Sequence, residues 1–408
     1  MTVASRSSKP SPAAVIIGAS AAGLHAASLL ARAGMLVYVF DQAEELGPPA
    51  RTLIVTPRIS DILGYVPSPA ILNRTSCLQL CSPAGSVAIR LREPDLIIER
   101  EKLIAHLARQ ARADGAELLP GYQFEGFEPD QDGIVLHLQS PSGRREHVRT
   151  RVLIGADGVS SRVAQAVAGK GAPAPGERPV RRPRVPAPRR TLSLLQATVA
   201  LPAGAGGDTT LVWFDPASTR FFYWLLPISA TRAVVGLIAE DPGQARTSLR
   251  AFLGAHGWEP LDYQGAQVPS YQRGGLPAAA VSGARVFLIG DAAGHVKMTT
   301  VGGAVTGLRG ARAAVQAILD SGQPGSESRA LDRELISHRL MRRVLDCFGP
   351  ADYDDLLALV NARMQGILGS VTRDEALRLL GPALLAQPRL LYLAARCFAG
   401  RNGASPEK

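Results

Sequence analysis

The sequence is short of cysteine, lysine and long apolar runs, and each shortage excludes a class of protein. The cysteines have neither zinc-finger spacing nor the density of a disulfide-stapled secreted domain. No stretch reaches the roughly 18 consecutive apolar residues that a transmembrane helix requires. The apolar N-terminal run lacks a signal-peptide cleavage site, so we expect a cytoplasmic protein, with membrane association as the alternative. The cysteine spacing predicts no metal site. The four cysteines are Cys77, Cys81, Cys347 and Cys397.

Lysine is scarce because only five of the 45 basic residues are lysine, and arginine carries most of the net charge of +10. A bias toward Arg, Ala and Pro is typical of genome composition, so the basic balance does not indicate a nucleic-acid partner. With 408 residues, of which 46% are apolar, the chain can bury a large core. Its length suggests two or three lobes.

Near the N-terminus, AAVIIGASAAGLHAASLLARAGMLVYVFDQ has the pattern of a strand, a glycine turn, a helix and a second strand ending at Asp41. A glycine turn lets the backbone approach a pyrophosphate while helix N–H groups point at it. An acid after the second strand can accept hydrogen bonds from ribose hydroxyls. The segment therefore predicts a dinucleotide site. Its candidate residues are Gly18, Ser20 in place of the middle glycine, Ala22, Gly23 and Asp41.

The rest of the chain alternates between helical and strand-like segments. Apolar spacing predicts a helix over 100–114 and amphipathic helices over 329–400, while 191–272 reads as strands of one sheet. The Pro- and Arg-rich stretch 169–190 has no periodicity, and we interpret it as a solvated loop, with contact to phosphate or acidic lipid as the alternative. Short strands are expected at 117–119, 124–128, 134–139 and 151–154.

Two further motifs follow the glycine turn, GADGVSSR at 155–162 and GDAAG at 290–294. In this order they resemble flavoproteins of the p-hydroxybenzoate hydroxylase fold. The resemblance implies an α/β fold with an FAD-binding Rossmann-like domain, an inserted, mostly antiparallel β-sheet substrate domain and C-terminal helices. The expected parts are 12–75, 100–168 and 273–322 for the FAD-binding domain, 76–99 and 191–272 for the substrate sheet, 169–190 for the loop and 323–408 for the C-terminal helical region.

The resemblance also implies roles for single residues. Asp291, after Gly290, meets the ribityl chain of FAD, and the turn at Gly302 and Gly303 approaches the isoalloxazine. A carboxylate suits the ribityl position because arginine can only donate. Arg100 contacts the flavin side of FAD. Asp157 and Gly158 match the third motif of the family and are expected to contact the cofactor. Ala164 replaces an arginine that the family usually carries in this motif, which weakens the expectation that the motif helps to bind nicotinamide.

Within this fold, GDAAGHVKMTTVGGAVTGLRG and FFYWLLP look most like the geranylgeranyl reductase family. By that resemblance Phe222, Trp224 and Pro227 line the substrate pocket. The family's proton-donating cysteine has no counterpart in the loop ELGPPARTLIVTPRISDIL, and His295 is the titratable candidate in its place. We interpret Lys297 as a solvated lysine, with a charge for a substrate or cofactor phosphate as the alternative.

The function favoured by these motifs is reduction of carbon–carbon double bonds in a lipophilic, isoprenoid-like substrate, with NADPH or NADH as the transient electron donor and FAD as the cofactor. One alternative is an FAD-dependent monooxygenase that hydroxylates or epoxidises a lipophilic or aromatic metabolite. A third hypothesis is a flavin-binding protein that contacts a membrane surface or a partner. Halogenation is disfavoured because 10–101 contains no lysine to receive hypohalous acid. The oligomeric state is left open.

Overall fold

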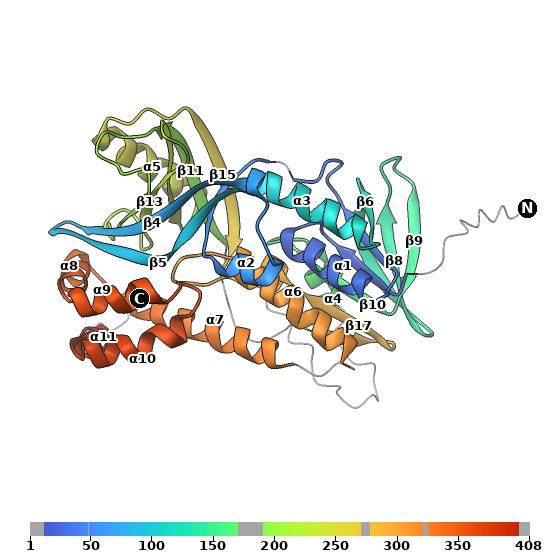
Figure 1. The fold of residues 1–408 in the computed structure, drawn as a ribbon. Coiled ribbons are helices and arrows are strands. Elements are labelled where there is room, and N and C mark those ends of the chain that lie inside the picture. The colour runs from blue at the N-terminus through green and yellow to red at the C-terminus, as the bar shows by residue number, and fades with distance from the viewer. Residues whose placement is uncertain (1–11, 48, 170–190, 271–277, 321–324, 400–408) are drawn as a thin grey trace, which may run out of the picture.

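The computed structural model describes residues 12–47, 49–169, 191–270, 278–320 and 325–399. The loop expected at 169–190 therefore lies outside the described residues except for Gly169, which ends a helix. Three β-sheets organise this part of the chain, and Figure 1 shows the two larger ones at opposite ends of the molecule. The C-terminal helices run beneath both. A six-stranded sheet near the N-terminus holds the glycine turn, and an eight-stranded sheet holds the FFYWLLP strand.

The six-stranded sheet is parallel except for one edge strand. Its central strands are continuous apolar runs, as expected for strands covered on both faces. Alternate residues pack against α1 (Ala21–Arg32), α3 (Arg100–Ala113) and α6 (Ala304–Leu319) on one face. The strand order is β16 (Ala278–Val281), β17 (Ala284–Leu288), β10 (Val152–Gly155), β1 (Ala14–Ile17), β2 (Val37–Asp41) and β6 (Glu117–Pro120).

The opposite face of this sheet is covered by a three-stranded antiparallel sheet and α4 (Arg162–Gly169). Val15, Ile17 and Phe40 point into this second layer, and their neighbours along β1 and β2 point into the first. This alternation follows from the two-residue repeat of a strand. The small sheet consists of β7 (Gln123–Asp130), β8 (Gly133–Gln139) and β9 (Arg145–Thr150).

The eight-stranded sheet is antiparallel except where β12 runs parallel to β4. It includes β3, which lies within 12–75, the first segment expected in the FAD-binding part, but pairs with β5 here. The strand order is β15 (Asp262–Pro269), β11 (Thr191–Ala200), β14 (Arg232–Ala239), β13 (Tyr223–Pro227), β12 (Thr209–Trp213), β4 (Ile71–Ser82), β5 (Gly85–Glu99) and β3 (Thr52–Val55).

The expectation of strands throughout 191–272 was wrong in one place, because α5 (Pro242–His256) covers one face of the eight-stranded sheet. The side chain of Asp241 caps the helix by accepting from the amide of Gln244, 2.9 Å away. Pro242 occupies the first turn, and Gly257 ends the helix with φ of +65°. These are standard start and stop signals that the strand pattern on either side obscured.

The C-terminal region is helical, as the amphipathic pattern predicts. Helix α7 packs on α6, while α8 and α9 pack against β4 and β5, so this region touches both large sheets or their covering helices (Figure 1). Its helices are α7 (Ser326–Leu345), α8 (Pro350–Ala358), α9 (Ala362–Ser370), α10 (Ala376–Ala386) and α11 (Arg389–Ala399). The remaining short helices are α2 (Arg58–Leu63), η1 (Ser68–Ala70) and η2 (Gly290–Ala292).

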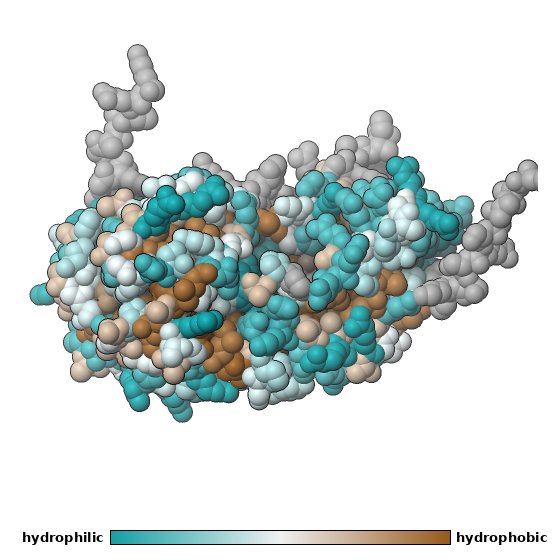
Figure 2. All heavy atoms as spheres, turned by 90° about the horizontal axis from the view of Figure 1, so that it is seen from above, coloured by the Kyte–Doolittle hydropathy of each residue, from teal (hydrophilic) through white to brown (hydrophobic). Residues whose placement is uncertain are grey.

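The surface seen from above is mostly hydrophilic, with apolar side chains gathered over the half that holds the eight-stranded sheet (Figure 2). Among the described helices, none combines the length and the apolar character needed to cross a membrane.

Candidate functional site

The turn that connects β1 to α1 leaves no room for a side chain at Gly18 or Gly23. Gly18 has φ of +104°, and a Cβ there would lie 2.4 Å from the carbonyl oxygen of Ala156. A Cβ on Gly23 would lie 2.1 Å from the oxygen of Gly18. Ser20 caps α1 because its hydroxyl accepts from the amide of Gly23 at 3.2 Å. Gly18, Ser20 and Ala22 line the central cavity, whereas Gly23 lies behind them.

Asp41 lies at the end of β2, on the cavity wall, and its carboxylate accepts from the amide of Ala19 at 2.6 Å. Two half-buried arginines, Arg51 and Arg100, line the same cavity. Arg100 donates to the oxygen of Gly47 at 2.7 Å. Burial lowers the pKa of both Arg51 and Arg100, although the carboxylate of Asp291 opposes the shift in each. The two guanidiniums therefore present concentrated positive charge to an anion in the cavity.

The GADGVSSR motif forms the turn from β10 to α4. The carboxylate of Asp157 accepts from the hydroxyl of Ser161 at 2.6 Å and from the amide of Val163 at 3.1 Å. Burial raises the pKa of Asp157, and these hydrogen bonds oppose the rise. Gly158 has φ of +78°. Both Asp157 and Gly158 line the cavity.

The GDAAG motif begins the tight turn that leads from β17 to α6. Gly290 and Asp291 line the cavity, as do Gly302 and Gly303. A Cβ built on Gly303 would lie 3.0 Å from Oδ1 of Asp291, so glycine lets the carboxylate approach the helix start. Val301 has φ of +50°, which is unfavourable for a β-branched residue. Such strain concentrates at ligand sites, where the surrounding structure holds it.

All these elements surround one cavity of about 870 Å³. Its other end is apolar and belongs to the eight-stranded sheet, with Phe222 and Trp224 on the wall; Pro227 does not line it. Three buried polar atoms of the lining have no hydrogen-bond partner among the described residues: Nε of Arg51, Nε1 of Trp224 and Oγ1 of Thr300. Buried polar groups are normally hydrogen-bonded, so these atoms favour a polar ligand in the cavity.

His295 lies outside the cavity lining. Its ring is 1% exposed and packs beneath the turn, where a Cβ on Gly310 of α6 would lie 2.0 Å from Nδ1. The carbonyl oxygen of His295 accepts a hydrogen bond from the hydroxyl of Thr306. This geometry does not bring the imidazole to the apolar end of the cavity, so the structure offers no support for His295 as the proton donor.

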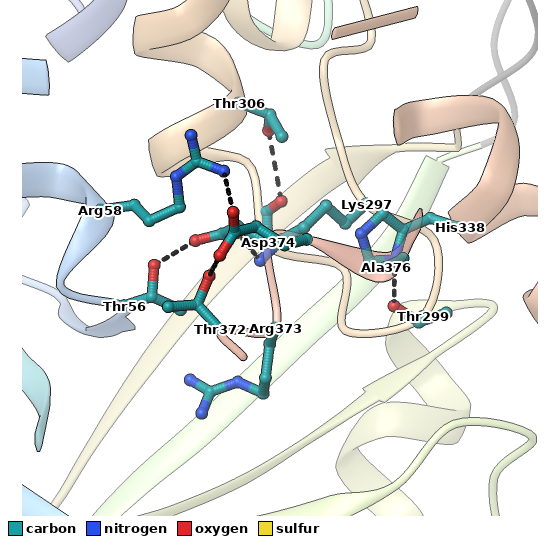
Figure 3. Close-up of polar contacts among 12 residues, drawn as sticks. Thr56, Arg58, Lys297, Thr299, Thr306, His338, Thr372, Arg373, Asp374 and Ala376 are labelled. Carbon is teal, nitrogen blue, oxygen red and sulfur yellow. Dashed lines mark hydrogen bonds and ion pairs between the residues drawn. The ribbon is translucent and has the colours of Figure 1, made fainter. Parts of the chain in front are cut away.

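The interpretation of Lys297 as a solvated lysine was wrong. Its side chain is 8% exposed and forms an ion pair with Asp374, whose side chain is fully buried (Figure 3). Both residues line the cavity. Thr56, between β3 and α2, donates to the other oxygen of the same carboxylate. Burial raises the pKa of Asp374, but the contacts with Lys297 and Thr56 lower it more, so the net shift is downward and the group is ionised.

The residues around Asp374 connect the C-terminal helices to the rest of the protein. Arg373 pairs with Asp95 of β5, and Glu375 pairs with Arg58 at 3.3 Å. The amide of Ala376 donates to Glu334 of α7. Residues 373–376 therefore contact β5, α2 and α7 as well as the turns that hold Thr56 and Lys297. Figure 3 shows Asp374 between Thr56 and Lys297.

Several of these residues carry no signal that sequence reasoning could have used. Arg51 is one of many arginines, and Asp374 lies 77 residues from Lys297. Only the scarcity of lysine could have directed attention to Lys297. Cys77 and Cys81 lie on β4, as expected, and neither lines the cavity. Burial raises the pKa of the Cys81 thiol, which keeps it protonated.

Comparisons with known proteins agree with this geometry. The FAD binding domain family matches residues 92–320, and the NAD(P)-binding Rossmann-like domain family matches 16–61. Geranylgeranyl diphosphate reductase of Rhodobacter capsulatus is 28% identical over 353 residues, covering 81% of this chain and 82% of that protein. Digeranylgeranylglycerophospholipid reductase 2 of Methanothermobacter thermautotrophicus is 26% identical over 399 residues, covering 90% and 95%.

Among solved structures, a geranylgeranyl bacteriochlorophyll reductase-like protein from Thermoplasma acidophilum superposes with a TM-score of 0.75 at 17% sequence identity. The superposition covers 95% of this chain and 99% of that one. At this identity the likeness shows the fold, and the expected fold class is confirmed.

Proposed function

This chain belongs to the FAD binding domain family and is an FAD-dependent oxidoreductase, and from this premise we propose that it reduces carbon–carbon double bonds in an isoprenoid chain at the expense of NADPH or NADH. The observation that carries the proposal is the cavity, which joins a nucleotide-type wall to an apolar wall on the eight-stranded sheet. The relatives named above, whose names describe reductases of geranylgeranyl compounds, support the same reaction.

The residues of the nucleotide wall fit FAD. The N-terminus of α1 would receive the diphosphate, since Gly18 and Gly23 leave no side chain in the way. Arg51 and Arg100 would add positive charge there. The other residues that we assign to the cofactor are Ser20, Ala22, Asp41, Asp157, Gly158, Gly290, Asp291, Gly302 and Gly303.

Asp41 would accept from the ribose and Asp291 from the ribityl hydroxyls. When bound, FAD supplies the two-electron chemistry by which a hydride passes from a nicotinamide to a substrate carbon. The chain's own residues bind and orient the reactants and exclude water. The sequence holds one glycine turn of the dinucleotide type, so the nicotinamide is proposed to visit the site transiently.

The apolar wall suits a hydrocarbon substrate. Phe222, Trp224 and Leu226 of the β13 region and Leu78 and Leu80 of β4, two strands away in the same sheet, all line the cavity. Transferring an isoprenoid chain from water to such a surface gains about 25 cal/mol per Å² of apolar area. The cations at this end are neutralised, because Lys297 pairs with Asp374 and Arg373 with Asp95. The enclosed part of the substrate is therefore proposed to be uncharged.

The test is anaerobic incubation of the FAD-loaded protein with NADPH and geranylgeranyl diphosphate, followed by mass analysis of the product. Reduction adds two hydrogens per double bond and proceeds without oxygen. A monooxygenase instead gives no product until oxygen is admitted, and its product then gains one oxygen atom. Oxygen-dependent incorporation of that atom would refute the proposal.

A further inference from the structure

Saturating a double bond requires a proton as well as a hydride, and few groups of the cavity lining can provide it. Arginine keeps its proton at any ordinary pH, and Asp374 is ionised. Asp157 already accepts two hydrogen bonds at the start of α4. Among the described side chains, those of Cys77, Cys81, Cys347 and His295 lie outside the lining. Among the lining residues described by the structure and located at the sheet end of the cavity, Lys297 is the ionisable group that carries a releasable proton.

The position of Lys297 suits this task. Its neighbours Val296 and Met298 pack in the same apolar cluster as Trp224 and Leu226, so the turn touches the substrate sheet. On the other side, Nζ would lie 3.5 Å from a Cβ built on Gly302. An isolated antiparallel β-bridge between Lys297 and Gly302 joins the two ends of this turn. The ammonium group therefore lies where the proposed flavin wall meets the apolar wall.

The groups facing Lys297 come from several elements. Asp374 contacts the ammonium directly, and Arg373 adds a second cation on the same connection between α9 and α10. His338 and Glu334 belong to α7. Burial is the main cause that lowers the pKa of His338, and the charge of Lys297 lowers it further, so this imidazole is neutral at pH 7. The site thus holds one ammonium against one fully buried carboxylate (Figure 3).

We propose that Lys297 is the proton donor of the reduction and that Asp374 is the residue that positions it. This inference rests on the proposed function. One alkene carbon receives the hydride, with both electrons, and the other receives a proton from Nζ of Lys297. The π bond is replaced by two C–H bonds, the nicotinamide is oxidised, and the ammonium becomes an amine that regains a proton from water before the next turnover.

Two substitutions separate proton donation from charge. Lys297→Met removes both the charge and the proton, whereas Lys297→Arg keeps the charge and the pairing with Asp374 but cannot release a proton. We expect both variants to retain FAD and to oxidise NADPH, and both to lose about 10²–10⁴-fold in double-bond reduction, the usual size of a general acid contribution. Lys102→Met, which removes a half-exposed lysine paired with Glu99, is the matched control.

A third variant, Lys297→Ala, adds a readout that a structural role would not affect. Added ethylammonium should restore reduction in this variant, with rates that follow the acidity of a series of amines, because a small amine can occupy the vacated space. Asp374→Asn should retain measurable reduction but shift its pH profile, since the lysine loses its counter-ion. Absence of rescue together with an unchanged pH profile in Asp374→Asn would overturn the inference.

The outcomes separate this inference from the proposed function. A wild-type protein that binds FAD but reduces no isoprenoid double bond refutes the function, and the inference with it. If wild type and Lys297→Arg reduce the isoprenoid substrate at similar rates, the inference alone is refuted, because a positive charge at this position is then sufficient for the reaction. Loss in both Lys297→Met and Lys297→Arg with FAD retained, and rescue by the amine, support it.

Discussion

Replacing Asp374 by asparagine removes the charge that faces Lys297 while keeping the shape of the side chain. The carboxylate is fully buried, and its partner is only 8% exposed, so neither can turn to water. At an effective dielectric constant of about 20, two charges 4 Å apart attract by about 4 kcal/mol. Losing one partner of a buried pair typically costs about 3–5 kcal/mol. We expect Asp374→Asn to be destabilised by this amount.

The assay is thermal unfolding of the FAD-loaded protein, in which this loss lowers Tm by roughly 4–6 °C. Because the folded-state pKa of Asp374 is lowered, its contribution is complete above about pH 4 and is lost as the pH falls through the folded value. The gap between wild type and variant should therefore be full at pH 7 and close in acid.

The double variant Lys297→Met/Asp374→Asn carries no unpaired charge and should be more stable than Asp374→Asn alone. Lys102→Met, at an exposed pair with Glu99, should cost less than about 1 kcal/mol. Equal Tm values for wild type and Asp374→Asn would refute the reasoning, since the carboxylate could then not be the buried partner of Lys297.

Three further predictions follow from other parts of the structure. Burial and nearby arginines lower the pKa of His25 from 6.5 to about 4, so between these values only the unfolded chain binds a proton at this residue, which should remove about 3 kcal/mol of stability as the pH drops. Urea unfolding at several pH values should show a clearly smaller fall in His25→Gln than in wild type, and a smaller change in His106→Gln, because His106 is less buried. Gly23→Ala places a Cβ 2.1 Å from a backbone oxygen and should weaken FAD retention at least tenfold in equilibrium dialysis, whereas Gly254→Ala, with open space around it, should retain FAD. Trp224→Phe removes an unpaired buried donor and should leave Tm unchanged, while raising KM by roughly five- to tenfold if the indole donates to a ligand; an unchanged KM would exclude that contact.

The parts of the molecule that the sequence predicts well are those set by local patterns. The β1–α1–β2 unit, α3 and the C-terminal helices follow from apolar periodicity and glycine stops, because local geometry and burial agree there. The glycine turn and Asp291 reach the same cavity because parallel strands place their carboxyl ends at one edge of the sheet.

The rest depends on contacts that no local pattern encodes. Whether His295 faces the cavity or α6 is decided by the space at Gly310, a residue on another element. Lys297 is buried only because Asp374, 77 residues away, neutralises it. A lysine at a turn ordinarily stays in water, and its burial follows from the arrival of the partner carboxylate.

The separation of Lys297 from Asp374 orders events during protein synthesis. A nascent chain emerging from the ribosome displays the lysine first, and Asp374, which completes that wall, follows 77 residues later. Until then the half-built pocket contains an unneutralised cation, which water must solvate. A chain truncated before residue 374 would therefore leave the Lys297 ammonium without its counter-ion, and that wall of the pocket would draw in water.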